Sequence, residues 1–211
     1  ARFKRGGKVP SPEECRELSM HRRVAPERRV AYALMSRTGA RRSEAVAVQW
    51  RDFLDWEPLR AVNYCRHEVL GRIVPGTKTI DSKISPLNPW VESVIYAWIC
   101  QYERVTGLKP EGSNYVVCKR YTRGPRRGEI HPYTGGLLEH YYKHHDREQV
   151  GLREELTLHD FRAAFRTHAQ EAGCSDKVMA YLLHPKPQDT EDLYLRTSYE
   201  TSCQEILKFP S

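Results

Sequence analysis

Two side chains that could hold an anion stand three residues apart in the stretch LHDFRAAFRTHAQEAG, residues 158–173. In a helix, His159 and Arg162 would lie on one side and could donate hydrogen bonds to a single ligand. Thr157 and Asp160 match a capping box, which places the start of this helix just before His159. One apolar stripe, with basic residues along its edge, is formed by Leu158, Phe161, Phe165, Ala169 and Ala172, with His159, Arg162 and Arg166 beside it. These cations are therefore expected at a rim rather than in the core, and an isolated pair of this kind is most often only a solvated helix edge.

A second candidate anion site lies in RTGARRSEAVAVQW, residues 37–50. Gly39 is the residue type that ends a helix in a left-handed cap, and Arg41 and Arg42 follow it directly. The next helix would begin there, with its free backbone N–H groups pointing outward. By itself this pattern is also that of a turn with exposed arginines.

A third stretch, LLHPKPQDTEDLYLR at 182–196, contains a histidine and a tyrosine ten residues apart. His184 would close one helix and Tyr194 would stand on the next. A lone tyrosine at helical spacing is usually a core or interface residue. None of the three stretches indicates a function by itself, so they must be interpreted together.

The elements that must position these residues are mostly helical. Helices are predicted from Ser11, which caps Pro12, and then over about 26–38, 43–50, 90–105, 135–147, 158–172, 176–183 and 190–206. Short β-rich segments broken by Gly and Pro occupy 60–87, while 106–133 is expected to be mostly loop with a turn at RGPRRGE. The prediction is a mainly α fold with a small antiparallel β-sheet or hairpin (α+β).

The overall charge favours a polyanionic partner without identifying one. The chain has 211 residues, 34 basic and 27 acidic, and a net charge of +7. Its six cysteines are scattered without a CxxC pair, so we expect reduced thiols rather than a disulfide framework or a zinc knuckle. No stretch of the sequence resembles a membrane span or a signal peptide, and a soluble protein is expected.

In this order and spacing, the motifs resemble the catalytic domain of the tyrosine recombinase and phage integrase family. The resemblance covers roughly residues 10–200. It includes the TGxR turn with a following acidic residue, a hairpin lysine, an HxxR helix, an LLxH stretch and a late tyrosine, which here are Arg41 with Glu44, Lys78, His159 with Arg162, His184 and Tyr194. The family fold is thereby implied, with residues 1–10 as a basic interdomain linker, 11–198 as the catalytic domain and 199–211 as a tail that docks on a neighbouring protomer or packs on its own domain.

The resemblance implies cleavage and rejoining of DNA through a 3′-phosphotyrosyl intermediate, without metal, ATP or any other cofactor. Tyr194 would be the nucleophile, and Arg41 and Arg162 would clamp the scissile phosphate. Lys78 would protonate the leaving 5′-oxygen, while His159 and His184 would move protons or bind phosphate oxygens. Glu44 and Asp160 would orient the arginines and the histidine.

Two assignments have close alternatives, because the sequence departs from the family pattern. Leu183 stands where the family usually has glycine, and the interval from His184 to Tyr194 is about one residue longer than usual. Tyr199 is therefore an alternative nucleophile. Lys83 is the alternative to Lys78, which is preferred for its distance from the "PL" at 86–87.

The partners implied are double-stranded DNA, further copies of the chain in a homotetramer on two duplexes, and accessory DNA-bending proteins. The chain alone is expected to be a monomer and a fragment of a longer integrase, located in the cytoplasm on the nucleoid of a bacterial or archaeal host and not at a membrane. A type IB topoisomerase and a catalytically inactive DNA-binding regulator of the same fold are the competing interpretations. A zinc site at HYYKHHDRE, residues 140–148 with His140 and His144 one turn apart, lacks further ligands of suitable spacing.

Overall fold

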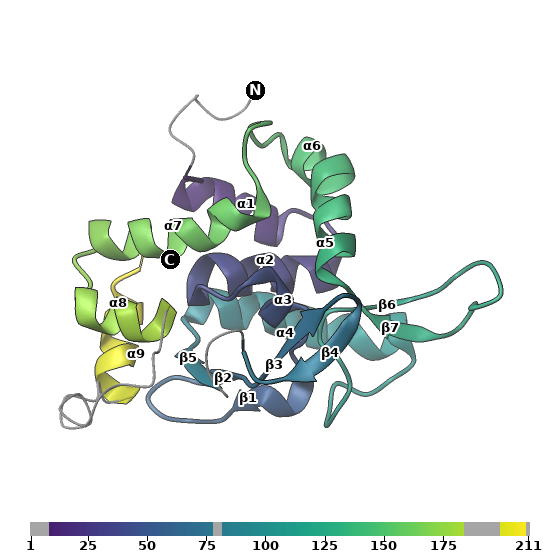
Figure 1. The fold of residues 1–211 in the computed structure, drawn as a ribbon, viewed down its shortest axis with the longest axis horizontal. Coiled ribbons are helices and arrows are strands. Elements are labelled where there is room, and N and C mark those ends of the chain that lie inside the picture. Colours follow the sequence, from purple (N-terminus) through teal and green to yellow (C-terminus); the bar gives the residue numbers. More distant parts are fainter. Residues whose placement is uncertain (1–8, 78–81, 184–198, 210–211) are drawn as a thin grey trace.

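In a computed structural model of the chain, residues 9–77, 82–183 and 199–209 are described. Helices dominate this part of the molecule (Figure 1). They are α1 (Pro12–Met20), α2 (Pro26–Thr38), α3 (Arg42–Ala45), α4 (Pro89–Thr106), α5 (Gly135–Tyr141), α6 (Arg147–Val150), α7 (Leu158–Glu171), α8 (Asp176–Leu183) and α9 (Tyr199–Leu207), with a 3-10 turn η1 (Trp50–Asp52) and a π-helical turn η2 (Tyr142–Asp146).

The strands form three small antiparallel sheets. Their bounds are β1 (Phe53–Leu54), β2 (Ala61–Tyr64), β3 (Arg66–Val69), β4 (Arg72–Pro75), β5 (Lys83–Pro86), β6 (Cys118–Arg120) and β7 (Ile130–Pro132). One sheet has the order β1-β2-β5, and β3-β4 and β6-β7 are two-stranded hairpins. The predicted class, mainly α with small antiparallel sheets, is confirmed.

Local sequence signals account for most helix ends. Ser11 and Glu14 form a capping box at α1, and Thr157 and Asp160 form one at α7. The α2 helix ends at Gly39, which adopts the left-handed conformation with φ of 64°. These ends lie where the residue types predicted them.

Two helix predictions need correction, and one loop prediction needs an addition. The helix predicted over 43–50 is only the single turn α3 followed by η1, because the chain leaves the helix after Ala45 to pair with residues 114–116. The segment 106–133 is mostly loop, as predicted, although β6 and β7 pair within it, and the RGPRRGE turn extends from the body of the molecule (Figure 1). The helix expected over 135–147 continues to Val150 through the π-helical turn.

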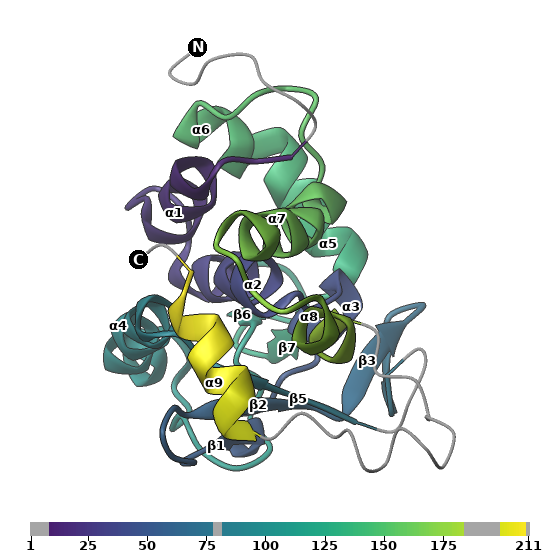
Figure 2. The same cartoon turned by 90° about the vertical axis from the view of Figure 1, so that its left-hand side faces the viewer.

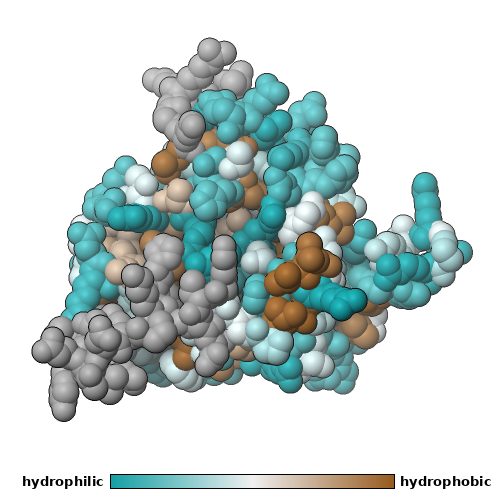
Figure 3. All heavy atoms as spheres, in the orientation of Figure 1, coloured by the Kyte–Doolittle hydropathy of each residue, from teal (hydrophilic) through white to brown (hydrophobic). Residues whose placement is uncertain are grey.

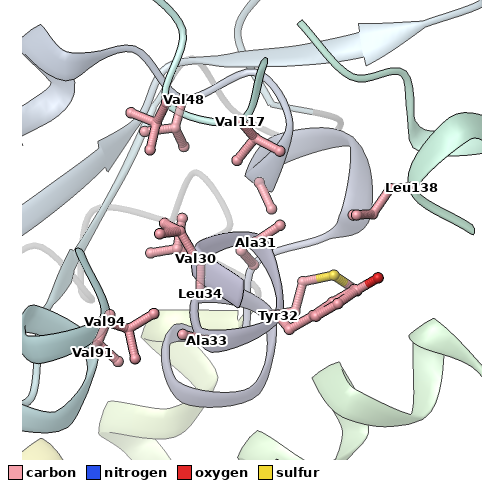
Figure 4. Close-up of a cluster of buried hydrophobic side chains, with 14 of the residues drawn as sticks. Val30, Ala31, Tyr32, Ala33, Leu34, Val48, Val91, Val94, Val117 and Leu138 are labelled. Carbon is pink, nitrogen blue, oxygen red and sulfur yellow. The ribbon is translucent and has the colours of Figure 1, made fainter. Parts of the chain in front are cut away.

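The α2 helix is the centre of the core. It packs against α1, α4 and α7, and most of its residues are buried (Figure 2). Figure 4 shows its side chains Val30, Ala31 and Leu34 between valines of the neighbouring elements and Leu138. A helix that is apolar around most of its circumference is expected at such a position.

A second apolar cluster joins the C-terminal helices. Phe165 of α7, Leu182 of α8 and Ile206 of α9 belong to it, and Phe209 stacks on Phe165 with ring centroids 5.2 Å apart. In this structure α9 therefore packs on its own domain, with Leu207 on its exposed side.

Among the described residues, no helix has the length and apolarity needed to cross a membrane. All six cysteines are described and are free.

Candidate active site

The turn between α2 and α3 brings three elements together. Gly39 has positive φ, and a Cβ atom there would lie 2.7 Å from both Leu183 Cδ2 and Phe165 Cδ1. Glycine is required on both grounds, since side chains rarely adopt this backbone conformation and there is no room for one. The close approach sets the carbonyl group of Gly39 against α7 and α8.

Arg162 of α7 makes hydrogen bonds at this point of close approach. Its Nη1 atom donates to the Gly39 carbonyl oxygen and its Nη2 atom donates to the Leu183 carbonyl oxygen at 2.8 Å. The side chain is only 8% exposed, so the predicted position at the rim of α7 is wrong for Arg162. The helix pattern placed it correctly at the edge of the apolar stripe, but α8 and the Gly39 turn cover that edge.

Burial lowers the pKa of Arg162, and the positive charge of Arg41 lowers it further. The two guanidinium groups are therefore close enough to interact electrostatically. Neither carbonyl that holds Arg162 neutralises its charge. An anion placed between the two arginines would relieve this repulsion.

Arg41 is held by a carboxylate three residues along. The backbone N–H of Arg41 donates to Glu44 Oε2 at 2.8 Å, and its Nη1 donates to Glu44 Oε1 at 2.7 Å. Glu44 is buried, whereas Arg41 is partly exposed. The carboxylate thus fixes the direction of Arg41 and leaves part of the guanidinium accessible.

Lys83 approaches the same carboxylate from β5. Its Nζ atom lies 3.7 Å from Glu44 Oε2, which makes an ion pair too long for a hydrogen bond, and 4.7 Å from the centroid of the Tyr64 ring. Within the described part of the chain the ammonium group has no hydrogen-bond partner, and the residue is 4% exposed. Burial lowers the pKa of Lys83 to about 8, helped by Arg162 and Arg41 and opposed by Glu44.

The balance of charge in this cluster is positive. Burial raises the pKa of Glu44, but the charge of Lys83 and the hydrogen bonds from Arg41 outweigh burial, so the pKa stays below its ordinary value. The ionised Glu44 carboxylate then pairs with two cationic side chains, Arg41 and Lys83, and a third, Arg162, interacts with the cluster through its charge. The cluster can bind an anion with oxygen acceptors, such as a phosphodiester.

Tyr64 and Thr38 support this cluster, and neither was predicted from the sequence. Thr38 Oγ1 donates to the Leu34 carbonyl oxygen at 2.6 Å, so the Tyr64 hydroxyl 2.6 Å away must donate to Thr38 Oγ1. Tyr64 and Lys83 are directly opposite in the register of β2 and β5. Strand pairing at this position was the signal that could have placed Lys83 over the tyrosine.

His159 and Asp160 lie in the first turn of α7. The imidazole of His159 is exposed, as the helix pattern predicted. The Asp160 Oδ2 atom accepts from the backbone N–H of Thr157 at 2.7 Å and from its hydroxyl at 2.8 Å. The contacts of Asp160 in the described part therefore cap the helix.

Lys78, His184 and Tyr194 fall outside the described residues. Tyr199, the alternative nucleophile, is described and its hydroxyl donates to the Leu59 carbonyl oxygen at 2.5 Å. Its ring packs edge-on against Trp56 at 5.0 Å, and burial raises its pKa. A phenol held in this way is poorly prepared to become a phenolate.

The described residues contain no group of three or more His, Cys, Asp or Glu side chains that could hold a metal ion. His140 and His144 do lie together, with ring centroids 4.7 Å apart. The charge in the candidate site is supplied by arginine and lysine side chains.

Comparison with known proteins gives the fold and the family. The model of the phage integrase family matches residues 12–201. No curated protein sequence matches the chain significantly.

The solved structures that are similar to this chain include the following three. The Tn1549 transposon integrase in complex with transposon right end DNA is 19% identical, with a TM-score of 0.55, 98% of this chain covered and 67% of that chain. The XerH site-specific recombinase bound to difH substrate is 17% identical, with a TM-score of 0.56 and coverage of 93% and 52%. The integrase from mycobacterium phage Brujita is 17% identical, with a TM-score of 0.59 and coverage of 100% and 61%. The chain therefore spans between about half and two thirds of the length of these structures.

Proposed function

Since the chain belongs to the phage integrase family, we propose that it is a site-specific DNA recombinase that cleaves and rejoins DNA through a 3′-phosphotyrosyl intermediate. The observation that supports this proposal is a cluster in which Arg41 and Lys83 pair with the Glu44 carboxylate while Arg162 is held at the adjoining Gly39 turn. Two guanidinium groups of different elements are positioned there with excess positive charge. Such a site suits a phosphodiester that gains negative charge during reaction.

The reaction we propose begins with the phenolate of Tyr194. Its oxygen attacks the scissile phosphorus, a P–O bond to tyrosine forms, and the bond from phosphorus to the 5′-oxygen breaks. A proton passes to the leaving 5′-oxygen, which becomes a hydroxyl. Attack by a second 5′-hydroxyl reverses these changes, so the energy of the phosphodiester is kept and no ATP is consumed.

Arg41 and Arg162 would bind the non-bridging oxygens of this phosphate. Arginine remains charged at any relevant pH and offers several N–H donors in a fixed plane. Arg162 already has two donors engaged with carbonyl groups, which fixes its plane before the ligand arrives. Binding then requires little reorganisation, and the stabilisation is available to the transition state.

Proton transfer needs groups of a different kind. We propose Lys78 as the acid for the 5′-oxygen, and His159 and His184 as groups that accept the tyrosine proton or donate to phosphate oxygens. Lys83, which has a pKa of about 8, is the competing acid. Its burial beneath Glu44 supports instead a role in holding that carboxylate, and through it Arg41. Asp160 would orient His159 only indirectly, by fixing the first turn of α7.

The assembly is proposed by analogy with the family. Residues 11–198 would form the catalytic domain, preceded by a basic linker at 1–10. Four copies would act on two DNA duplexes, with residues 199–211 available for contact with a neighbour through the exposed side of α9. We also propose a cytoplasmic location on the nucleoid and accessory DNA-bending proteins, with no metal or other cofactor.

Two other functions remain as alternatives within this fold. A type IB topoisomerase would use a similar set of arginine, lysine, histidine and tyrosine, but would reseal its own strand. A DNA-binding regulator would keep the fold without cleavage. The presence of chemically competent residues at all proposed positions favours the recombinase.

A covalent trap tests the proposal without knowledge of a target site. The chain is incubated with supercoiled plasmid in EDTA, quenched with detergent and digested, and peptides are searched by mass spectrometry for a nucleotide-tagged tyrosine. A tag on Tyr194 is expected, and it should be absent in Tyr194→Phe and present in the matched variant Tyr199→Phe. Multiple relaxed topoisomers with resealed strands would favour the topoisomerase.

The negative outcomes separate the other interpretations. A tag on Tyr199 would keep the chemistry and move the nucleophile. If neither the chain nor a version extended to the full length of the similar structures gives a tag, the proposal of an enzyme is wrong and the DNA-binding regulator is favoured.

A further inference from the structure

The hairpin β3-β4 is firmly attached at its base. Arg66 Nη2 pairs with Asp52, and the backbone N–H of Gly76 donates to the Cys65 carbonyl oxygen at 2.8 Å. The His67 Nδ1 atom lies 2.7 Å from the carbonyl oxygen of Gly76. The Arg66–Asp52 pair ties the hairpin to η1, and the other two contacts close the hairpin's own base.

A carboxylate in the hairpin fixes it next to the candidate active site. Glu68 Oε2 accepts from the backbone N–H of Gly135 at 3.0 Å, and Glu68 Oε1 accepts from the backbone N–H of Gly71 at 2.5 Å. A Cβ atom on Gly135 would lie 2.9 Å from Arg42 Nε and 3.1 Å from Glu68 Oε2. The hairpin therefore meets α3 at Arg42, the residue next to Arg41, and β3 packs along α3.

The tip of the hairpin departs from the residue choice that its turn favours. Leu70 and Gly71 both have positive φ, 50° and 81°, as in the two-residue turn that normally takes Asn-Gly. In the described part of the chain, Leu70 is the one residue other than glycine with positive φ. A leucine there is strained, so folding alone does not account for it.

The same side chain is the most exposed large apolar group described. Leu70 is 97% exposed and its neighbour Val69 is 42% exposed. Figure 3 shows an apolar patch at the place that the hairpin occupies in Figure 1. Arg72, directly opposite Val69 in the register, is exposed beside them. The tip thus presents a leucine together with a cation.

We propose that this tip, Val69 to Arg72, enters a groove of the DNA duplex whose scissile phosphate binds at Arg41 and Arg162. Leu70 contacts bases or sugars there, and Arg72 contacts a phosphate. The proposal rests on the proposed function and adds a contact that the reacting groups do not supply. Duplex DNA is the occupant favoured by the net charge of +7 and by the cation at the tip.

The dimensions fit this occupant. The major groove of B-DNA, about 12 Å wide, admits a two-stranded β-ribbon. From Glu68, which is anchored beside α3, the strand reaches Leu70 in two residues, or about 7 Å. Base edges within a few base pairs of the bound phosphate are therefore within reach of the tip.

The variant Leu70→Asn tests the contact without damage to the hairpin. Asparagine accepts positive φ, so the melting temperature should stay equal or rise, while the apolar contact is lost. We expect the affinity for a random 40-base-pair duplex, measured by fluorescence anisotropy, to fall about three- to tenfold. The loss should be similar at every salt concentration, because an apolar side chain releases no counterions. The control Tyr96→Asn removes another exposed apolar residue, on α4, and should leave the affinity unchanged.

The variant Arg72→Gln tests the proposed phosphate contact separately from the apolar contact of Leu70. Loss of one phosphate contact should reduce the slope of log affinity against log salt by about one. A merely structural hairpin would instead show a fall in melting temperature for Leu70→Asn and no change in this slope for Arg72→Gln.

A crosslinking measurement identifies the occupant directly. A benzophenone amino acid at position 70 should crosslink to the duplex on irradiation, and the same group at position 96 should not. Crosslinks from position 70 only to a second copy of the chain would overturn DNA as the occupant. If neither the unchanged chain nor a version extended to the full length of the similar structures binds duplex, both proposals fall; if the chain binds and Leu70→Asn binds equally well, only the hairpin proposal falls.

Discussion

The two ends of α2 hold buried arginines in opposite ways. Near its start, Arg28 donates to both oxygens of Asp146, through Nε at 2.7 Å and Nη2 at 2.9 Å. At its far end, Arg162 donates to two main-chain carbonyl groups and to no carboxylate among the described residues. The first arginine is neutralised by a directly bonded carboxylate, whereas the second has no direct ion pair and only the more distant charge of Glu44 to offset its own.

The pKa values follow this difference. Burial alone would lower the pKa of Arg28, but its hydrogen bonds with Asp146 raise it well above the ordinary value. Burial and the charge of Arg41 lower the pKa of Arg162. A buried arginine that stabilises the fold is thus paired, whereas one that can receive an anion is held by neutral acceptors.

The surroundings of Arg28 complete its neutralisation. Asp146 is fully buried in the π-helical turn, and its Oδ2 atom also accepts from the Tyr32 hydroxyl at 2.7 Å. The Tyr133 hydroxyl, which accepts from Arg28, donates to Glu27 Oε1 at 3.0 Å. This network ties α2 to the segment 133–146 and surrounds Arg28 with its own acceptors.

The largest expected effect is on stability at the paired end. Asp146→Ala leaves Arg28 buried without a counter-charge, so the free energy of unfolding should fall by about 3–5 kcal/mol. Denaturant unfolding followed by circular dichroism measures it. The double variant Arg28→Met with Asp146→Leu should recover most of the loss, because no unpaired charge remains. Loss of less than about 1 kcal/mol in Asp146→Ala would contradict the structural role.

At the other end, the effect should appear in cleavage. Arg162→Gln should lower the rate of covalent complex formation about 10²- to 10³-fold, as for the loss of one preorganised donor to a reacting anion. Stability should change by less than about 2 kcal/mol, since glutamine still donates to one carbonyl. Arg166→Gln, an exposed arginine one turn further along α7, is the matched control and should cleave normally. Equal rates of covalent complex formation for Arg162→Gln and Arg166→Gln would contradict a role of Arg162 in binding the reacting phosphate.

The smallest effect concerns pH and Lys83. The pKa of Lys83 is about 8 in the folded state against 10.5 ordinarily, so between these values the unfolded chain binds the extra proton. Stability attributable to this residue should therefore rise as pH increases from about 8 to 10.5. The free energy of unfolding of the unchanged chain, relative to Lys83→Met, should increase when urea titrations are compared at pH 7.5, 8.5 and 9.5. Lys143→Met, at an exposed lysine, controls for loss of a cation, and a flat difference would show that Lys83 is not desolvated.

Much of the fold could be predicted from residue types because the signals are local. The cap at Gly39, the capping boxes at Ser11 and Thr157, and the sheet between 60 and 87 all depend on a few adjacent residues. The hairpin β6-β7 was missed because strands of three residues, CKR and IHP, are too short to show alternation.

The candidate site was only partly predictable, for a different reason. The sequence indicated Arg41 and Arg162 as ligands, but the helix pattern could not reveal that α8 and the Gly39 turn bury Arg162. The choice between Lys78 and Lys83 could not be made from the sequence, because the contact of Lys83 with Glu44 depends on how distant segments pack and Lys78 lies outside the described residues. A residue pattern within one segment cannot reveal its contacts with distant segments.

The two acceptors that fix Arg162 belong to the main chain, at Gly39 and Leu183. A side-chain acceptor is lost when its residue is substituted, whereas a carbonyl oxygen is present at every residue and stays in place while the backbone keeps its path. Only a shift of α7, α8 or the turn after α2 can withdraw these two acceptors. The orientation of this guanidinium therefore depends on the path of the backbone, which glycine at position 39 preserves, and not on the identity of any acceptor side chain.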